Sequence, residues 1–327
     1  MKLWFPMPET ATGAEVFTLQ LAQALSARGI ETVVTRYSKQ IEAMPWFLSA
    51  YRPPPNVDVV HLNAGSARGF LGHGIPSVIT GHGAFELAAY DIHKTFPQKL
   101  YHSLLVRRGI KKAIGNANAV TAVSRWVADI YRAEYAERSV EVINNWVDAE
   151  IFLPVRKSLA RKLLFVGRPA WQKGSHLLPE LISFLGNDFD LTCTLGENEW
   201  PGKVPPNVHL IGPIDRKEMP GLYQTHDALV VPSIAEGFCI AAAEAMACGL
   251  PVFGFRGHGL DDALGACAPY TAADMPDIRG LAEQVHNVLG DPAVYQMISD
   301  QGRQHVIENL TQQKAVDAYL AIYHGLK

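Results

Sequence analysis

Cysteine is scarce in this sequence, with only four among 327 residues. None forms a C-x-x-C pair, and none pairs with a nearby histidine at the spacing of a zinc site, so neither a disulfide framework nor a structural metal is indicated. This usage is typical of a reducing cytosol. The four residues are Cys193, Cys239, Cys248 and Cys267.

Long apolar runs are missing as well. The longest stretch without a charged residue, 69–85, contains five glycines, one proline and two histidines, which excludes it as a membrane span. The apolar start of the chain is interrupted by Pro6 and is too short for the core of a secretory signal. We therefore expect a soluble, cytoplasmic protein that is at most peripherally attached to a membrane.

A large excess of one charge is also absent. The chain has 29 Lys and Arg against 32 Asp and Glu, a net charge of −3, which argues against binding nucleic acid through bulk charge. The distribution is uneven, because residues 1–143 hold 15 basic and 11 acidic side chains whereas residues 144–327 hold 14 and 21. Two halves that differ in this way are expected to face different partners.

The sequence does have enough apolar residues for two cores, at 48% of a length that predicts two domains. Short apolar runs alternate with helical patterns, and this alternation predicts two parallel sheets covered by helices. The join is expected within 144–154, where polar residues follow a strand. The predicted strands are 2–5, 31–35, 57–62, 77–80, 119–123 and 141–143, then 162–166, 191–195, 208–210, 228–231 and 251–255.

The segment 231–251 is predicted to run strand, loop, helix and stop. The helix is rich in alanine and ends at Gly249, so its N-terminus opens beyond the carboxyl end of a strand, where open α/β sheets bind ligands. Glu236 lies in the loop, and Glu244 lies roughly 12 Å further along the helix axis. The two carboxylates are too far apart to act on one bond, but they could hold two ends of an extended ligand. Glu244 is flanked by Ala and Met, so a buried carboxylate there needs a partner.

Segment 163–175 has the same layout, with Arg168 and Lys173 in the loop after a buried strand. Two cations at this position could neutralise a diphosphate, although solvated loop cations are the commoner situation. Near the N-terminus, Gly13 would let the backbone of the first helix, 15–28, approach an anion. His82 follows the strand 77–80 and is a site candidate or a structural histidine; His258 has the same two interpretations.

These residues resemble a known family. Residues 236–251 are similar to the E-x7-E signature of retaining GT-B glycosyltransferases, specifically glycosyltransferase family 4. Further motifs in the matching order extend the resemblance over nearly the full length. They are Gly13-Ala14-Glu15, Ser124 after its strand, Ile143-Asn144-Asn145-Trp146-Val147-Asp148 and Phe165-Val166-Gly167-Arg168 with Lys173-Gly174.

The resemblance implies a GT-B fold, in which two doubly wound Rossmann-like domains face each other across a cleft. Residues 1–145 would bind the acceptor, residues 146–311 would bind the nucleotide-sugar, and a C-terminal helix, 312–327, would cross back to the first domain. The implied activity is transfer of a sugar from a UDP- or GDP-sugar to a glycan, lipid-linked or small-molecule acceptor, as in polysaccharide or lipopolysaccharide biosynthesis.

The resemblance also implies a role for each site residue. Glu244 would bind the ribose hydroxyls, and Glu236 the donor-sugar region. Arg168 and Lys173 would stabilise the leaving diphosphate, with Gly13 approaching it from the other domain. His82 would position the sugar, and the backbone near Ile214 would lie by the nucleobase. Backbone N–H groups would contact the sugar hydroxyls at Gly237, Phe238 and Cys239.

No metal or other cofactor is expected. Asp188 and Asp190 form a D-x-D pattern, but they precede the strand 191–195 and so lie at the wrong end of the sheet for the site. The loop reading Gly257-His258-Gly259-Leu260-Asp261-Asp262 has aspartates where the family often has Glu, and Thr12 replaces the family's first glycine.

Three alternatives stay open at this stage. A GT-B epimerase or phosphorylase would use the same fold, as would a catalytically silent scaffold that binds a sugar nucleotide or a glycan.

The segment between Lys94 and Arg138 contains nine basic residues and only three acidic ones. That excess is either a solvated helical face, as over 98–114, or a surface for an anionic membrane or an acidic lipid-linked glycan.

Overall fold

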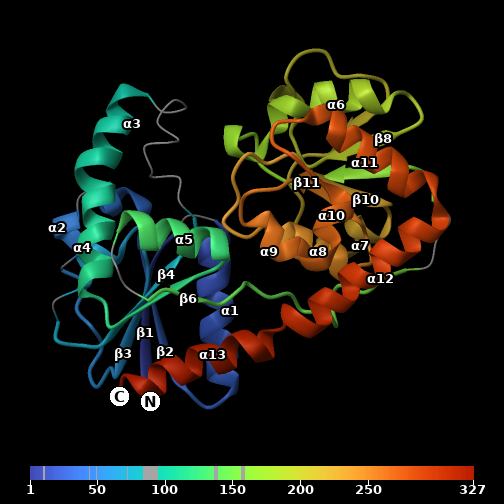
Figure 1. The fold of residues 1–327 in the computed structure, drawn as a ribbon. Helices are drawn as coiled ribbons and strands as arrows, with labels where there is room; N and C mark the ends of the chain where they lie inside the picture. Colours follow the sequence, from blue (N-terminus) through green and yellow to red (C-terminus); the bar gives the residue numbers. More distant parts are fainter. Residues whose placement is uncertain are drawn as a thin grey trace. The chain divides into compact units, whose positions relative to one another are not determined.

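The computed structural model describes residues 1–9, 12–43, 45–48, 50–71, 73–83, 95–135, 139–155 and 159–327. The chain divides into two compact units, which are described separately (Figure 1). Unit 1 comprises Met1–Asn145 and Gln312–Lys327, and unit 2 comprises Trp146–Thr311. The assignment of an acceptor to the first and a donor to the second stays a prediction.

Unit 1 contains a six-stranded sheet in the order β2-β1-β3-β4-β5-β6, with every pair parallel. Its central strands are almost wholly buried because helices cover both faces, which explains their continuous apolar sequences. The strands are β1 (Lys2–Glu9), β2 (Glu31–Ser38), β3 (Val59–Asn63), β4 (Ser77–Gly81), β5 (Ala119–Ala122) and β6 (Glu141–Val142).

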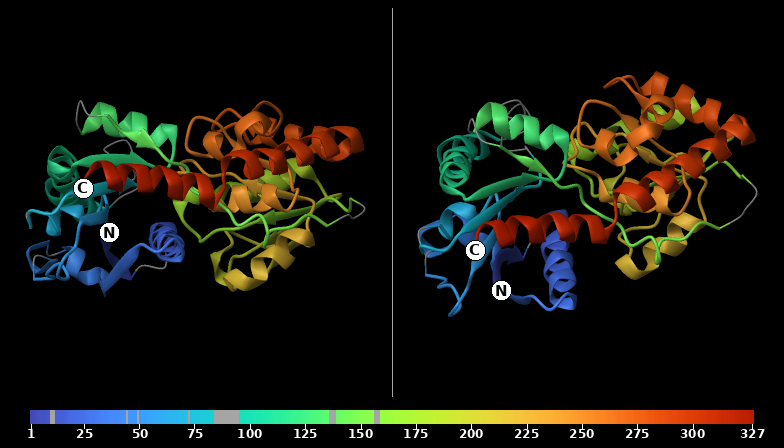
Figure 2. Two further views of the ribbon diagram at one scale, coloured as in Figure 1. Left: turned by 90° about the horizontal axis from the view of Figure 1, so that it is seen from below. Right: turned by 60° about the horizontal axis from the view of Figure 1, so that its bottom comes forward.

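The helices of unit 1 include α13, which returns from the end of the chain to pack on this sheet (Figure 2). Its Tyr319 and Tyr323 are fully buried, and they reach Thr80 and His61 on the sheet. The helices are α1 (Gly13–Ala27), η1 (Lys39–Ala43), α2 (Pro45–Leu48), η2 (Ala67–Gly69), α3 (Phe96–Tyr101), the π-helical η4 (His102–Arg107), α4 (Arg108–Asn116), α5 (Arg125–Glu134) and α13 (Gln312–Gly325).

Strand β1 runs four residues further than the sequence predicts, through Pro6 and Pro8. Because the Lys2 carbonyl accepts from Asp58 N, even-numbered residues of β1 turn their backbone polar groups toward β3. The pairing of β3 with β1 ends at Trp4, so neither proline removes a hydrogen bond. The predicted strand end at Phe5 is therefore wrong, because both prolines occupy positions that need no N–H group.

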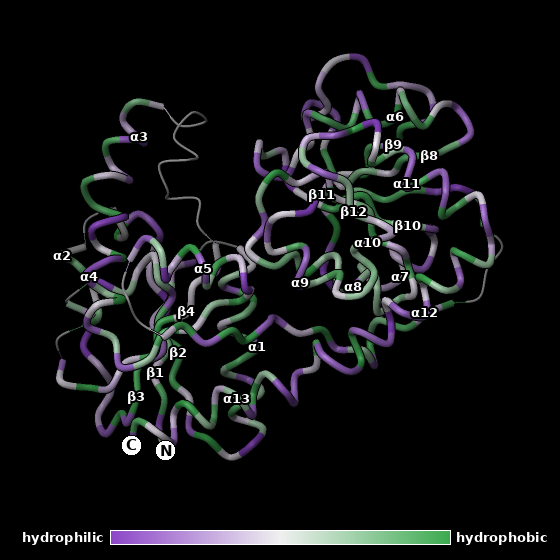
Figure 3. The backbone as a smooth tube through the Cα atoms, in the orientation of Figure 1, coloured by the Kyte–Doolittle hydropathy of each residue, from purple (hydrophilic) through white to green (hydrophobic). Residues whose placement is uncertain are grey.

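Unit 2 repeats the parallel design with the strand order β12-β11-β10-β7-β8-β9. Its central strand β10, Ala-Leu-Val-Val, is hydrophobic throughout (Figure 3). The two-residue strand β12 was not predicted, because two alanines carry no strand pattern. The strands are β7 (Lys162–Phe165), β8 (Asp190–Cys193), β9 (Val208–Leu210), β10 (Ala228–Val231), β11 (Val252–Phe255) and β12 (Ala272–Ala273).

Helix α8 (Ile240–Ala247) lies in the core of unit 2. Four of its alanines, 242, 243, 245 and 247, have no exposed surface, and α12 packs against it at Gly302. The remaining helices are η5 (Trp171–Lys173), η6 (Ser175–Leu177), α6 (Leu178–Leu185), η7 (Glu197–Glu199), η8 (Arg216–Glu218), α7 (Met219–Gln224), α9 (Leu260–Leu264), η9 (Gly265–Cys267), α10 (Ala268–Thr271), α11 (Ile278–Gly290) and α12 (Pro292–Asn309).

Candidate active site

Three loops meet at the carboxyl edge of the unit 2 sheet, after β7, β10 and β11. Backbone hydrogen bonds join them: Ile234 N donates to Gln172 O at 2.9 Å, and Gly259 N donates to Glu236 O at 3.0 Å. His258 Nε2 bonds to Ser233 O at 3.0 Å, and its Nδ1 accepts from Leu260 N. His258 is therefore a structural loop residue here.

Glycine is required where these loops cross. Gly174 has a φ of +69°, and a Cβ there would lie 1.7 Å from Pro232 O. A Cβ at Gly259 would lie 2.1 Å from Gly237 O. The loop after β7 and the loop after β11 thus both touch the backbone of the loop after β10, which fixes the positions of the charged side chains that they carry.

Glu236 and Lys173 form an ion pair within this assembly. Lys173 Nζ lies 2.7 and 3.0 Å from the two carboxylate oxygens of Glu236, and Ser233 Oγ donates to the same carboxylate at 2.7 Å. The Glu236 side chain is 7% exposed and that of Lys173 is 34% exposed. Burial lowers the pKa of Lys173, but the charge and hydrogen bonds of Glu236 outweigh it, so the pKa lies above its ordinary value.

Arg168 is exposed in the same loop as Lys173. Its charge acts to lower the pKa of Lys173, so the two cations lie within electrostatic reach of each other. The loop is anchored through Gly167, whose N–H donates to Thr194 Oγ1 at 3.0 Å. This edge of the sheet therefore carries two cations, one of which is neutralised by Glu236.

The backbone between the loop and α8 is unusual. Cys239 caps the helix with a φ of +71°, a conformation that costs a non-glycine residue about 1–3 kcal/mol. Gly237, Phe238 and Cys239 form the turn that leads into the helix. Burial raises the pKa of the Cys239 thiol to about 12, which keeps it protonated and unsuited to act as a nucleophile.

Glu244 lies inside unit 2, about one turn into α8. Arg216 Nη2 donates to its carboxylate at 3.0 Å and Tyr223 Oη donates at 3.1 Å, while the Glu244 side chain is 7% exposed. Burial raises the pKa of Glu244, and the two donors act against that rise. The apolar sequence around Glu244 predicted a partner but not which one, because Arg216 is 28 residues away in the chain.

Ile214 is half-buried between β9 and η8, two residues before Arg216. The segment that the resemblance places beside the nucleobase is thus tied to Glu244 through Arg216. The sequence offered no signal for this link, since Arg216 stands in an ordinary polar stretch.

The two predicted site residues of unit 1 lie at the carboxyl edge of its own sheet. Gly13 is the exposed first residue of α1, after β1. His82 directly follows β4, with Nε2 at 2.9 Å from Asn63 Oδ1 and its ring 4.7 Å from that of Phe17. Burial lowers the pKa of His82 to about 4, so the imidazole is neutral at pH 7.

The D-x-D pattern lies at the opposite edge of unit 2. Asp190 opens β8, and the Asp188 side chain is 81% exposed and pairs with Arg161 at 3.4 Å. Within the described part of the chain, no group of three or more His, Cys, Asp or Glu side chains is arranged to hold a metal ion.

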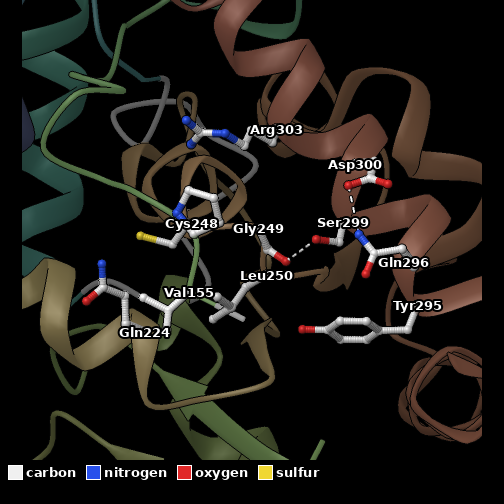
Figure 4. Close-up of a pocket in the computed structure, with 11 residues that line it drawn as sticks. Val155, Gln224, Cys248, Gly249, Leu250, Tyr295, Gln296, Ser299, Asp300 and Arg303 are labelled. Atoms are coloured by element: carbon white, nitrogen blue, oxygen red, sulfur yellow. Dashed lines mark hydrogen bonds between the residues drawn. The ribbon is translucent and has the colours of Figure 1, made fainter. Parts of the chain in front are cut away.

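A cavity of about 450 Å³ lies at the other end of α8, away from the three loops (Figure 4). Ser299 bonds there to the carbonyl of Gly249, and Gln296 to Asp300. None of the predicted site residues lines it. Its lining is Pro154, Val155, Gln224, Cys248, Gly249, Leu250, Tyr295, Gln296, Ser299, Asp300 and Arg303.

Comparison with known proteins accounts for both units. The family model "Glycosyltransferase Family 4" matches residues 36–151, and "Glycosyl transferases group 1" matches residues 202–305. The 2-deoxystreptamine glucosyltransferase of Streptomyces kanamyceticus is 28% identical over 280 residues, which cover 76% of this chain and 70% of that enzyme.

Solved structures agree on the fold. Sucrose-phosphate synthase from Thermosynechococcus elongatus superimposes with a TM-score of 0.83 at 18% identity, over 99% of this chain and 98% of that one. Anabaena HepE in complex with UDP-glucose gives a TM-score of 0.74 at 15% identity, over 98% and 100%. The chain is therefore a glycosyltransferase with the GT-B fold, and its first unit matches the model of glycosyltransferase family 4.

Proposed function

We propose that this enzyme is a retaining transferase that moves a sugar from a UDP- or GDP-sugar to a glycan, lipid-linked or small-molecule acceptor. The observation that carries the proposal is the pairing of Lys173 with Glu236 at 2.7 Å beside Arg168, on loops fixed by Gly174 and Gly259. A donor sugar at Glu236 would thereby have its phosphates next to two cations.

The chemical step is heterolysis of the bond between the sugar and the diphosphate. Positive charge develops on the sugar while negative charge develops on the leaving nucleotide. Arg168 and Lys173 would stabilise that leaving group, and preorganised charges of this kind often contribute more to catalysis than any other single effect. Retention fits a same-face substitution in which the leaving phosphate takes the acceptor's proton. A two-carboxylate mechanism fits poorly, because Glu236 and Glu244 occupy separate ends of the site.

We propose that no metal is needed, because Arg168 and Lys173 supply the two positive charges at the diphosphate. UDP-glucose is the first donor to test, since HepE was solved with it. GDP-sugars come next, because backbone atoms near Ile214 would read the base and leave no side-chain signature. The assay measures nucleotide release from a donor panel, with and without acceptors and with and without a chelator. Absence of both turnover and donor binding for every donor would overturn the proposal.

The same assay separates the alternatives. An epimerase turns over its donor without an acceptor, and a phosphorylase requires free phosphate. A silent scaffold binds nucleotide but has no turnover to lose on Glu236→Gln, whereas the transferase loses turnover and keeps part of its nucleotide affinity.

Helix α3 and its extension through η4 and α4 support a membrane contact as part of this function. Phe96, Leu100 and Leu104 recur every four residues and are 78%, 50% and 44% exposed. Residues 95–116 contain no acidic side chain but several basic ones. Exposed apolar side chains next to cations suit the headgroup region of an anionic bilayer.

The basic region between Lys94 and Arg138 that the sequence analysis identified is only partly described by the structure. Lys94, Glu137 and Arg138 lie outside the described residues. The cations of the helical run are Lys99, Arg107, Arg108, Lys111 and Lys112.

Vesicle co-sedimentation tests that contact. No described helix is long and apolar enough to span a membrane. We expect binding to vesicles that contain phosphatidylglycerol, weakened by salt and by the triple change of Phe96, Leu100 and Leu104 to Ser. Equal binding by the variant, or none by the unaltered enzyme, would leave the solvated-face interpretation.

A further inference from the structure

A chain of hydrogen bonds leads from α1 to His82. Thr18 Oγ1 donates to Ala14 O, one turn earlier in α1, at 2.8 Å. Its hydroxyl proton is thereby used, so its oxygen accepts from Asn63 Nδ2 at 3.3 Å. The amide of Asn63 is then oriented with Nδ2 toward Thr18 and Oδ1 toward His82 Nε2, at 2.9 Å.

The orientation of this amide decides the tautomer of His82. An amide oxygen can only accept a hydrogen bond, so His82 Nε2 must carry the proton. In the neutral ring the other nitrogen, Nδ1, then holds a lone pair and can only accept. Among the described residues no hydrogen-bond partner of Nδ1 is found.

The surroundings of His82 keep the ring neutral. Phe17 of α1 packs edge-on against it, with Tyr319 of α13 behind Phe17. The titratable group that interacts with it is His61 on β3, which is buried and bonds to Tyr323 Oη and Thr80 Oγ1. Burial, and then the influence of His82, lowers the pKa of His61 to about 3, so neither ring is charged at pH 7.

We propose that Asn63, held by Thr18, is a positioning residue that fixes His82 with its proton on Nε2 and presents Nδ1 as an acceptor to a hydroxyl group of the sugar substrate. This rests on the proposed function, in which His82 lies beside the sugar. A histidine held in this way accepts one hydrogen bond through Nδ1.

Histidine NMR of the full-length protein, labelled with 15N, tests the tautomer without any activity. We expect the Nε2–H tautomer in the unaltered enzyme and a mixture of tautomers in Asn63→Ala. A protonated Nδ1 in the neutral unaltered enzyme would overturn the proposal even if all variants failed to fold. The control is Asn118→Ala, which removes the amide bonded to Ser77 N at the amino end of β4 and should leave His82 unchanged.

Kinetics then test the consequence for sugar transfer. Asn63→Ala should lower kcat/KM about tenfold, the effect of losing one hydrogen bond of ordinary strength. In Asn63→Asp the carboxylate stabilises the imidazolium and raises the pKa of His82, so activity should survive at pH 8 and fall as Nδ1 becomes protonated at lower pH. An unchanged pH profile in Asn63→Asp would contradict the proposal. If the tautomer is as expected but no donor is turned over, the proposed function fails and the positioning role stands.

Discussion

Single side chains at the edge of the unit 2 sheet can be tested one at a time. Lys173→Ala or Arg168→Ala should lower kcat by about 10²–10³, because in the proposed function each removes a preorganised charge from the leaving diphosphate. Arg279→Ala, a change of an exposed cation on α11, is the matched control. Steady-state rates of nucleotide release measure the effect. If both variants kept rates within a few-fold of the control, leaving-group stabilisation by this loop would be ruled out.

Glu244 allows a prediction about pH. Burial raises its pKa, so the carboxylate that we propose binds the ribose hydroxyls is lost as the pH falls through that raised value. Calorimetric titration of UDP or GDP between pH 5 and 8 should show affinity declining toward acid. Glu244→Gln should bind about 10–100-fold more weakly, the range for a charge-assisted hydrogen bond, and without that pH dependence. A pH dependence that persists in Glu244→Gln would assign it to another group.

At the scale of elements, two glycines at positive φ separate local strain from loop contact. Gly174 has a φ of +69°, and Gly29, which follows α1, has a φ of +77°, so Gly174→Ala and Gly29→Ala both place a Cβ at positive φ, which costs about 1–2 kcal/mol. At Gly29 nothing lies within 4 Å, whereas at Gly174 the Cβ meets Pro232 O. Gly174→Ala should therefore lose about 1–3 kcal/mol more free energy of unfolding, and most activity. Equal losses in urea unfolding would show that the loops can separate.

The sequence was most informative about the positions of the secondary-structure elements. The apolar runs predicted the strands well because both faces of each sheet are covered, so almost every residue of a central strand is apolar. The two alanines of β12 carry no such pattern, and β1 continues through two prolines that only its pairing explains. Within the site, Glu236 and Lys173 could be selected by their loops. Arg216, Tyr223 and the Thr18–Asn63 pair could not, since contacts between distant segments depend on the folded sheet.

For the whole molecule, buried neutral histidines predict sensitivity to acid. The pKa values of His61 and His82 are lowered to about 3 and about 4 in the folded protein, against about 6.5 when unfolded. Stability from this source is complete above pH 6.5 and is lost as the pH falls, because the unfolded chain takes up protons first. The free energy of unfolding should fall by about 1 kcal/mol per pH unit for each histidine between pH 6 and 5, and the slope from His82 should diminish toward pH 4 as the folded ring takes up its proton.

Urea unfolding at several pH values measures that slope. The control is His209→Gln, since His209 is 54% exposed and its replacement should leave the slope unchanged. Tyr323→Phe should cost about 1–3 kcal/mol by leaving buried His61 without one partner. A stability that is flat from pH 7 to 4 would mean that the two histidines stay accessible to protons in the fold.

The solvent-free alanines of α8 have a consequence for evolution of this chain. Where side chains have no exposed surface and neighbours pack against them, each added methyl group must displace something else. Valine lies one nucleotide from alanine, so random mutation supplies that change constantly, yet in a deep mutational scan it should be depleted at 242, 243 and 245. The buried positions of this helix should tolerate few substitutions, whereas exposed α11 positions such as Arg279 and Glu283 should tolerate many.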